Sequence, residues 1–140
     1  MTRITFYFNA PDKLETARKL AAKAFQSGQH ALVYTADAAL TQQLDTRFWT
    51  AQQLAFLPHV ACTHPLARET PILIGDDPTP LAQADVLINL DDETPVFFGR
   101  FARVLDIVGL DEADKERGRS RFKFFKARGY ALDTHDLATG

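Results

Sequence analysis

The sequence predicts an α/β fold in which a mostly parallel, doubly wound sheet is covered by helices on both faces. Short apolar runs alternate with helix-like stretches along the 140 residues, as in chains built from strand-helix units. The runs are bounded by Pro, Gly and Asp, which is typical of buried parallel strands. Because no internal repeat or long linker interrupts this alternation, we expect a single domain over residues 1–140.

The first two predicted elements are a strand over residues 4–8 and a helix over residues 11–28. The strand is the apolar run "ITFYF". In the helix, Asp12 and Glu15 have capping-box spacing, and Gly28 supplies a C-terminal stop. The apolar stripe of this helix consists of Leu14, Ala17, Leu20, Ala21 and Ala24.

The alternation continues through the middle of the chain. A strand is predicted over residues 31–35 ("ALVYT") and a shorter helix over residues 37–46. Residues 48–71 form the least regular part. Two short apolar runs, at residues 71–75 ("PILIG") and 85–90 ("DVLINL"), are predicted as the third and fourth strands.

Two further helices are predicted near the C-terminus. The first covers residues 95–109, "PVFFGRFARVLDIVG", with Pro at its start. The second covers residues 111–129, with acidic residues early and basic residues late. That order of charges suits the helix dipole.

Composition excludes several classes of protein. The 46% hydrophobic content is ordinary for a globular domain, so disorder is not expected. The sequence holds no apolar run approaching the roughly 18 residues of a membrane span, and "MTRITFYFNAP" has no signal-peptide apolar region. The single cysteine, Cys62, excludes an intrachain disulfide. We therefore expect a cytoplasmic protein with no membrane partner.

Positive charge is concentrated in one segment. Residues 115–130 carry seven Lys or Arg and one Glu, whereas the rest of the chain has nine basic and seventeen acidic residues. Proteins that follow a nucleic-acid backbone usually spread their positive charge over a face or groove. One basic element on an acidic body favours a small, local anionic partner.

Motifs for catalysis or cofactor binding are weak. Neither GxGxxG nor GxxxxGK[ST] occurs, and Pro11 removes a backbone donor after the first strand. His59, Cys62 and His64 lack a fourth zinc ligand. The acids of residues 75–77 are ordinary at a strand end. We predict no catalytic residue, no metal and no cofactor.

The basic segment has a helical pattern with two interpretations. Four bases fall within about 80° on a helical wheel, with Phe122 and Phe125 beside them. In the first interpretation these rings anchor the helix in the core and the bases are solvated. In the second, an Arg one turn before an aromatic ring binds a carboxylate and an apolar side chain together. The four bases are Lys115, Arg119, Lys123 and Lys126.

The second interpretation predicts a specific ligand, an acidic peptide with an apolar last residue and a free carboxyl terminus. Gly118 is unfavourable in a helix interior by roughly 1 kcal/mol, which indicates close approach by a neighbouring element. An alternative keeps the same helix, residues 111–128, as a direct binder of single-stranded nucleic acid. In that alternative Phe124 and Phe125 stack on bases.

Five segments, in this order and spacing, carry a resemblance to a known family: "TFYF", "FQSGQHALVYTAD", "LDTRFW", "FLPH" and "RSRFKFFKARGY". Over about 130 residues the chain resembles the chi subunit of bacterial DNA polymerase III. The resemblance implies a Rossmann-like fold without nucleotide chemistry and a non-catalytic accessory role in the replicase.

The resemblance also implies partners and site residues. Members of the family bind the acidic C-terminal tail of single-stranded DNA-binding protein and join the clamp-loader complex through the psi subunit, so that DNA is reached indirectly. Some members use the psi surface for a helicase. The matching tail-binding residues are Val108, Lys115, Arg119, Phe122 and Lys123, with Val108 and Phe122 as pocket walls. The matching psi or helicase residues are Trp49, Phe56 and Pro58, although Trp49 and Phe56 equally fit a core role.

Overall fold

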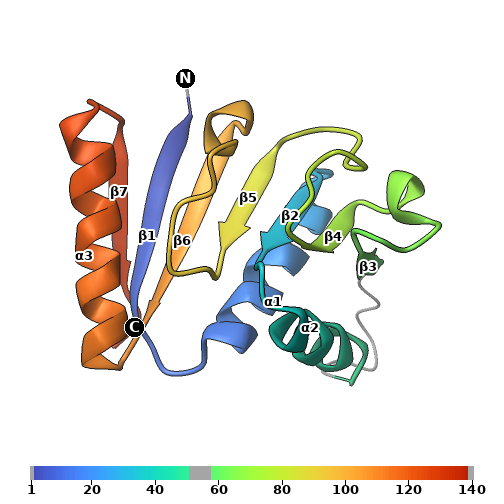
Figure 1. Ribbon diagram of the computed structural model, residues 1–140, viewed down its shortest axis with the longest axis horizontal. Coiled ribbons are helices and arrows are strands. Elements are labelled where there is room, and N and C mark those ends of the chain that lie inside the picture. Colours follow the sequence, from blue (N-terminus) through green and yellow to red (C-terminus); the bar gives the residue numbers. More distant parts are fainter. Residues whose placement is uncertain (1, 51–57, 139–140) are drawn as a thin grey trace.

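The computed structural model describes residues 2–50 and 58–138, without the side chains of residues 49 and 50. Its centre is a seven-stranded sheet in the order β3-β4-β2-β5-β6-β1-β7 (Figure 1). All the strand pairs are parallel. The strands are β1 (Arg3–Ala10), β2 (Ala31–Tyr34), β3 (His59–Ala61), β4 (Ile72–Gly75), β5 (Val86–Asn89), β6 (Arg103–Gly109) and β7 (Leu132–Asp136).

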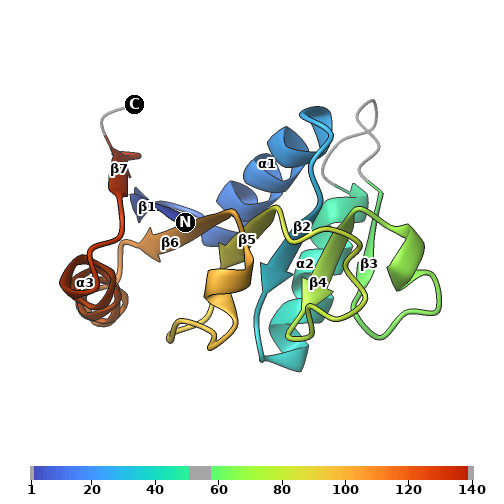
Figure 2. The same cartoon turned by 90° about the horizontal axis from the view of Figure 1, so that it is seen from above.

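Helices cover both faces of this sheet. α1 (Lys13–Gln26) and α2 (Ala38–Thr50) pack over one hydrophobic cluster, and α3 (Glu112–Ala127) packs over the other. Figure 2 shows α1 and α3 on opposite sides of the sheet. Two 3-10 turns, Ala67–Glu69 and Phe98–Arg100, complete the described elements. The predicted α/β class, with a parallel sheet covered on both faces, is confirmed.

α1 forms as its sequence predicts. The Asp12 carboxylate accepts a hydrogen bond from the Glu15 backbone N–H at 3.3 Å, which satisfies one of the free donors of the first turn. Gly28 follows the helix with φ of 74°, in the left-handed region that favours glycine. The buried face of α1 consists of Ala17, Leu20, Ala21 and Ala24.

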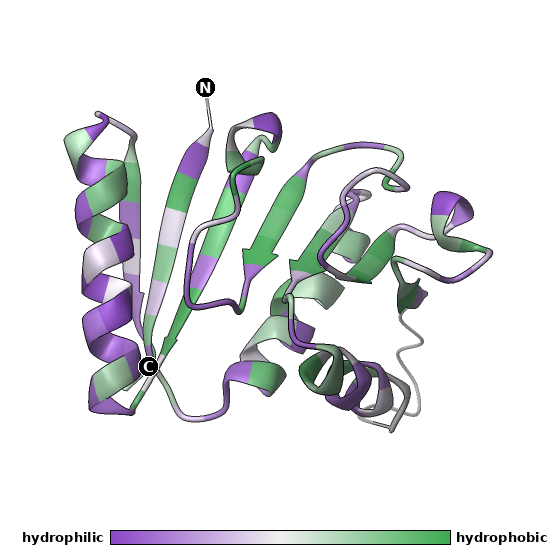
Figure 3. Ribbon diagram, in the orientation of Figure 1, coloured by the Kyte–Doolittle hydropathy of each residue, from purple (hydrophilic) through white to green (hydrophobic). Residues whose placement is uncertain are grey.

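The central strands form the most hydrophobic part of the molecule and are green in Figure 3. Residues of β2, β4 and β5 alternate between the two clusters, so Leu32 faces the α3 side and Val33 the α1 side. Helices lie on both faces, so neither side of these strands can be polar.

One predicted helix is wrong. Residues 95–109 form a short 3-10 turn followed by β6, which lies between β5 and β1. The stretch Arg103–Gly109 is rich in β-branched residues and is buried on both faces, which suits an inner strand better than a helix. A fully buried strand has no polar alternation, so periodicity alone did not separate it from a helix.

Two strands were not predicted. β3 has three residues and lies at one edge of the sheet, and β7 ("LDTHD") lies at the other edge. β7 is mostly exposed and polar, which hides it from a search for apolar runs. α2 also continues to Thr50, beyond the predicted residue 46.

Candidate functional site

The carboxyl ends of β1 and β6 lie side by side, where the chain leaves β1 toward one face and β6 toward the other. Sheets of this type bind ligands at such a point. Here it is bridged by an ion pair, with Lys13 Nζ 3.1 Å from Asp114 Oδ2. The same oxygen accepts a hydrogen bond from the Gly109 N–H at 2.7 Å.

A carboxylate also occupies the N-terminus of α1. Asp12 caps the helix and pairs with Arg47 at 2.6 Å. A phosphate at this helix end would meet that negative charge, and Pro11 offers no N–H. These contacts agree with the absence of a glycine-rich phosphate loop.

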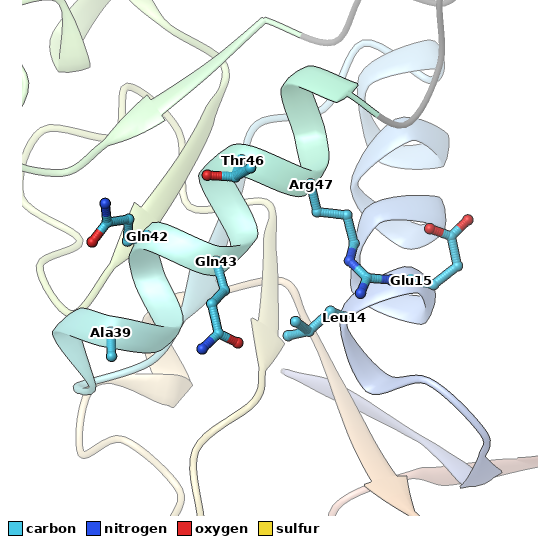
Figure 4. A pocket seen from close by; sticks show the side chains of 7 residues that line it. All are labelled: Leu14, Glu15, Ala39, Gln42, Gln43, Thr46 and Arg47. Carbon is cyan, nitrogen blue, oxygen red and sulfur yellow. The ribbon is translucent and has the colours of Figure 1, made fainter.

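A cleft of about 760 Å³ separates α1 from α2. Figure 4 shows its lining side chains, with Gln43 directed toward Leu14 and Arg47 reaching across to α1. The charged groups in it are already engaged, since Glu15 pairs with Arg18 and Arg47 pairs with Asp12. Its remaining polar groups are amides and a hydroxyl, so we assign it no chemistry.

The weak metal motifs have structural roles. His59 lies 3.4 Å from Asp45, and His64 Nδ1 accepts a hydrogen bond from the Leu66 N–H. Burial raises the pKa of the Cys62 thiol, which keeps it protonated. Among the described residues, no group of three or more His, Cys, Asp or Glu could hold a metal ion.

The acids that follow β4 also have a structural role. Asp77 closes a turn by accepting a hydrogen bond from the Thr79 N–H at 2.9 Å. Contacts with Thr79 lower the pKa of Asp77. Because a turn-closing acid at a strand end is ordinary, nothing here points to a metal or phosphoacceptor site.

The structure divides the basic segment between two flanks of α3. Lys115 is half-buried, and Arg119, Lys123 and Lys126 are exposed. We call these four residues the basic stripe, since helical spacing places them on one side. Arg119 lies 2.8 Å from Glu116 and 3.8 Å from Glu112. These ion pairs within α3 orient its exposed guanidinium. The hydrogen bond from Arg119 lowers the pKa of Glu116.

Phe122 lies beside the basic stripe and leans on β1. Its ring centroid is 5.3 Å from that of Phe6 and 6.4 Å from that of Phe8. Phe122 and Phe8 are both half-buried, so each keeps part of its ring accessible. Sequence reasoning missed Phe8 as a site residue, although the period of two along the strand places it on the same face as Phe6.

Val108 lies beneath α3. The family resemblance implied a pocket wall at Val108, and the structure places this residue in the core, where it is 1% exposed. A Cβ atom built on Gly118 would lie 2.7 Å from Val108 Cγ2. The predicted close approach at Gly118 is therefore confirmed, and Val108 supports the helix that carries Arg119 and Phe122.

The other three arginines of the segment have different surroundings. Arg121 is buried and donates two hydrogen bonds of 2.9 Å to the buried Asp106 carboxylate. Arg117 pairs with Asp92 and Asp114. The Arg128 guanidinium lies 3.9 Å from the ring centroid of Phe124. Burial raises the pKa of Asp106, and the charge of Arg121 opposes this shift.

The aromatic rings required by the nucleic-acid alternative are not both available. Phe125 is fully buried against Phe6, Phe98 and Tyr130. Phe124 keeps part of its surface, with the Arg128 guanidinium over one face of the ring. Base stacking needs an open ring face, so this alternative loses most of its support.

Of the expected psi or helicase residues, the two that the structure describes lie at the other end of the sheet. Trp49 is in the last turn of α2, with its side chain outside what the structure describes. Phe56 lies outside the described residues. Pro58 is half-buried and immediately precedes β3, the edge strand farthest from β7.

Comparison with solved structures shows a shared fold. A Saccharomyces cerevisiae Dbp5 variant bound to Nup159, a Gle1 variant, IP6 and ADP superposes with a TM-score of 0.68 at 12% identity. The match covers 97% of this chain and 42% of that one. A second structure of a yeast Dbp5 variant, bound to RNA and ADP BeF3, gives a TM-score of 0.64 at 10% identity over 96% of this chain and 41% of the other. At such identity the likeness concerns the fold alone.

Sequence comparison is more specific. Residues 1–133 match the family model described as "DNA polymerase III chi subunit, HolC". The DNA polymerase III subunit chi of Pseudomonas aeruginosa is 34% identical over 141 aligned positions, covering 98% of both chains. That of Haemophilus influenzae is 32% identical over 124 positions, covering 88% of this chain and 86% of its own. This chain therefore belongs to the DNA polymerase III chi-subunit family, whose members are accessory subunits in DNA replication.

Proposed function

We propose that this chain is a non-catalytic adaptor that binds the acidic C-terminal tail of single-stranded DNA-binding protein. In this proposal it links that protein to the clamp-loader complex through psi and works in the cytoplasm. The observation that carries the proposal is the pairing of an exposed guanidinium, Arg119, with a partly accessible ring, Phe122, one turn apart on α3.

The chemistry of the tail suits this arrangement. A terminal carboxylate accepts two parallel hydrogen bonds from a guanidinium fork. The terminal apolar side chain would lie against Phe122 and Phe8, where the sheet already supplies an apolar base. Lys115 and Lys123 would attract the acids that precede the terminus, and Val108 holds the helix from beneath Gly118.

The proposed psi surface and the proposed tail surface lie at opposite ends of the sheet, which supports an adaptor role. We assign psi, or a helicase in its place, to Trp49 at the end of α2, to Pro58 immediately before β3, and to Phe56, which lies outside the described residues. Strands β3 and β7 are the two edges of the sheet and lie at opposite ends in Figure 1. They are separated by six inter-strand steps of about 4.8 Å each. Two partners at these ends would not compete for space.

A non-catalytic role fits the carboxyl edge of the sheet. The Lys13–Asp114 pair fills the crevice beside β1 and β6, and the Asp12 carboxylate holds the N-terminus of α1. These contacts favour a binding protein over an enzyme that uses nucleotides. None of the described helices is long and apolar enough to span a membrane.

The deciding experiment is calorimetric titration of an acidic peptide that ends in phenylalanine with a free carboxylate. Arg119→Ala should weaken binding by about tenfold or more, since it removes a charge-assisted bidentate contact. Lys19→Ala removes the same charge from an exposed site on α1, across the sheet, and should leave the affinity unchanged. Equal affinity of wild type and Arg119→Ala would contradict the proposal.

A further inference from the structure

α3 borders a groove on the flank turned away from the basic stripe. The groove has a volume of about 820 Å³ and lies between α3 and residues 92–98, the segment that leads into β6. Figure 2 shows this segment, in orange, on the same side of the sheet as α3. Arg117, Arg121, Phe124 and Arg128 line it at helical spacing, on the opposite side of the helix from Lys115 and Arg119.

The floor of the groove is apolar and supported by the core. Phe98 and Phe124 lie 5.9 Å apart in an edge-on arrangement, and both pack edge-on against the buried Phe125. Pro95 and Val96 add an apolar rim, and Val96 is 97% exposed. An apolar side chain of a ligand could bury its surface here, between the exposed Val96 and the aromatic floor.

The three arginines differ in how much charge they leave for a ligand. Arg121 is neutralised by Asp106, and its Nη1 also donates to the Asp92 carbonyl at 2.6 Å. Arg117 is shared between Asp92 and Asp114. Within the part of the chain that the structure describes, Arg128 forms no ion pair, and its guanidinium rests on the Phe124 ring. Arg128 is therefore the cation that a ligand can use.

The charge of the groove selects the class of ligand. Asp92 and Glu93 line the wall opposite α3, and Asp106 and Asp114 lie behind the arginines. Counted with Lys13, which pairs with Asp114, these four acids balance four bases, so the groove has no excess of positive charge to hold a chain of phosphates. A ligand with a single carboxylate and an apolar side chain matches both the floor and the one uncompensated cation.

We propose that this groove is a second peptide-binding site, which takes an extended segment carrying an aromatic or aliphatic side chain next to a carboxylate. The side chain lies on Phe98 and Phe124 beside Val96, and the carboxylate pairs with Arg128. The site is separate from the basic stripe and does not depend on Arg119 or Phe122. α3 thus presents one peptide site on each flank.

The test is an NMR titration of the ¹⁵N-labelled full chain with N-acetyl-L-phenylalanine, which carries one ring and one carboxylate. Backbone amides of Val96, Phe98 and Phe124 should shift in a saturable manner. Arg128→Gln should weaken this binding by about fivefold, because a charge-assisted contact is lost. N-acetyl-L-phenylalaninamide, which has no carboxylate, should bind the wild type and the variant equally weakly.

Controls separate this site from the basic stripe. Arg119→Ala should leave the shifts at Val96 and Phe98 unchanged, whatever it does to binding near Phe122. The inference is overturned if no saturable shift occurs at Val96 to Phe124 in the wild type, or if Arg128→Gln binds the probe as well as the wild type. It is equally overturned if a thymidine oligonucleotide, and not the probe, shifts these amides. The shifts at Val96 and Phe98 are independent of the tail-binding proposal, which concerns Arg119 and Phe122.

Discussion

Gly118 of α3 lies directly against Val108 of β6, so closely that a Cβ atom at position 118 would stand 2.7 Å from Val108 Cγ2 and 3.1 Å from Cγ1. Real Cβ atoms essentially never come within 3.0 Å of a heavy atom from a packed neighbour, so the 2.7 Å contact would force a shift. The contact sets the distance between helix and sheet, and through it the height of Arg119 and Phe122 above β1. Glycine is needed here for space, and its backbone lies in the ordinary helical range.

Gly118→Ala should therefore destabilise the protein, although alanine is the better helix former. Overpacking a core contact costs about 1–3 kcal/mol, and the helical preference for alanine returns roughly 1 kcal/mol. Val108 is a branched, buried side chain that cannot swing aside. These two effects leave a net loss of up to about 2 kcal/mol in the free energy of unfolding, measured by urea denaturation.

Gly99→Ala is the matched control, because a Cβ atom there would meet nothing within 4 Å. Its effect should stay within about 0.5 kcal/mol, as for other unconstrained surface positions. If Gly118→Ala is as stable as Gly99→Ala, Val108 moves aside for the added methyl group and the contact does not require glycine.

The sequence predicted most of the fold because its elements agree with simple rules. The apolar runs of β2, β4 and β5 and the capping signals of α1 led to correct elements. β6 was mistaken for a helix because an inner strand buried on both faces has no period of two. β7 was missed because edge position in a sheet depends on partners that are distant in the sequence.

The candidate site could be predicted only in part for a similar reason. Helical spacing grouped Lys115, Arg119 and Lys123, which all lie on α3, since spacing along one helix is local. It could not show that Arg121 turns inward to Asp106, a partner 15 positions away on another element. The groove beside residues 92–98 depends on how a loop folds back over the sheet, and no local pattern encodes that.

Arg121→Met should be strongly destabilising. The substitution leaves the Asp106 carboxylate, which is 0% exposed, without its two hydrogen bonds from the guanidinium. Breaking a buried pair from one side costs about 3–5 kcal/mol. Chemical denaturation should show this loss, whereas Lys126→Met, an exposed change on the same helix, should have an effect within about 0.5 kcal/mol.

The double variant with Asp106→Leu and Arg121→Met distinguishes an unpaired charge from lost packing. Replacing both partners with apolar side chains removes the buried charge, so most of the lost stability should return. A double variant as unstable as Arg121→Met alone would show that shape, and not charge, governs this position.

Asp114 should make the stability depend on pH under acid conditions. Burial alone would raise its pKa, but the Gly109 N–H and the Lys13 ammonium outweigh burial and hold the pKa below the ordinary 3.8. The folded state thus favours the carboxylate more than the unfolded state does. Its contribution to stability is fully present above pH 3.8 and is lost as the pH falls through the lower folded value.

Asp114→Asn tests this link between charge and stability. At pH 7 the variant should be less stable than the wild type by about 1–2 kcal/mol, the value of a charge-assisted hydrogen bond. The difference should shrink as the pH is lowered past 3.8, because the wild-type carboxyl is then protonated too. A difference that stays constant from pH 7 to pH 2 would exclude Asp114 as the titrating group.

Phe8→Ala tests whether the tail-binding surface extends onto β1. If the terminal side chain of the tail lies against both Phe122 and Phe8, the truncation should weaken peptide binding by about tenfold, comparable to losing part of a buried aromatic contact. Phe8→Leu should lose less. Phe25→Ala removes a ring that is 37% exposed on α1 and should leave binding unchanged. Unaltered affinity in Phe8→Ala would confine the site to α3.

The proposed separation of the two partner surfaces predicts independent binding. The proposed tail surface lies on α3 beside β1, and the described residues of the proposed psi surface lie beside β3, at the far edge of the sheet. In this proposal neither partner would touch an element of the other's site, so no differential contact would couple them. The tail peptide should bind the psi complex and the free chain with the same dissociation constant, within about twofold. Calorimetry on both forms measures this dissociation constant directly, with Arg119→Ala as the variant that weakens tail binding in each.

A tenfold change in the tail's dissociation constant on psi binding would contradict independence. It would require the sheet, or segments at its carboxyl edge such as the Lys13–Asp114 bridge, to shift between two states.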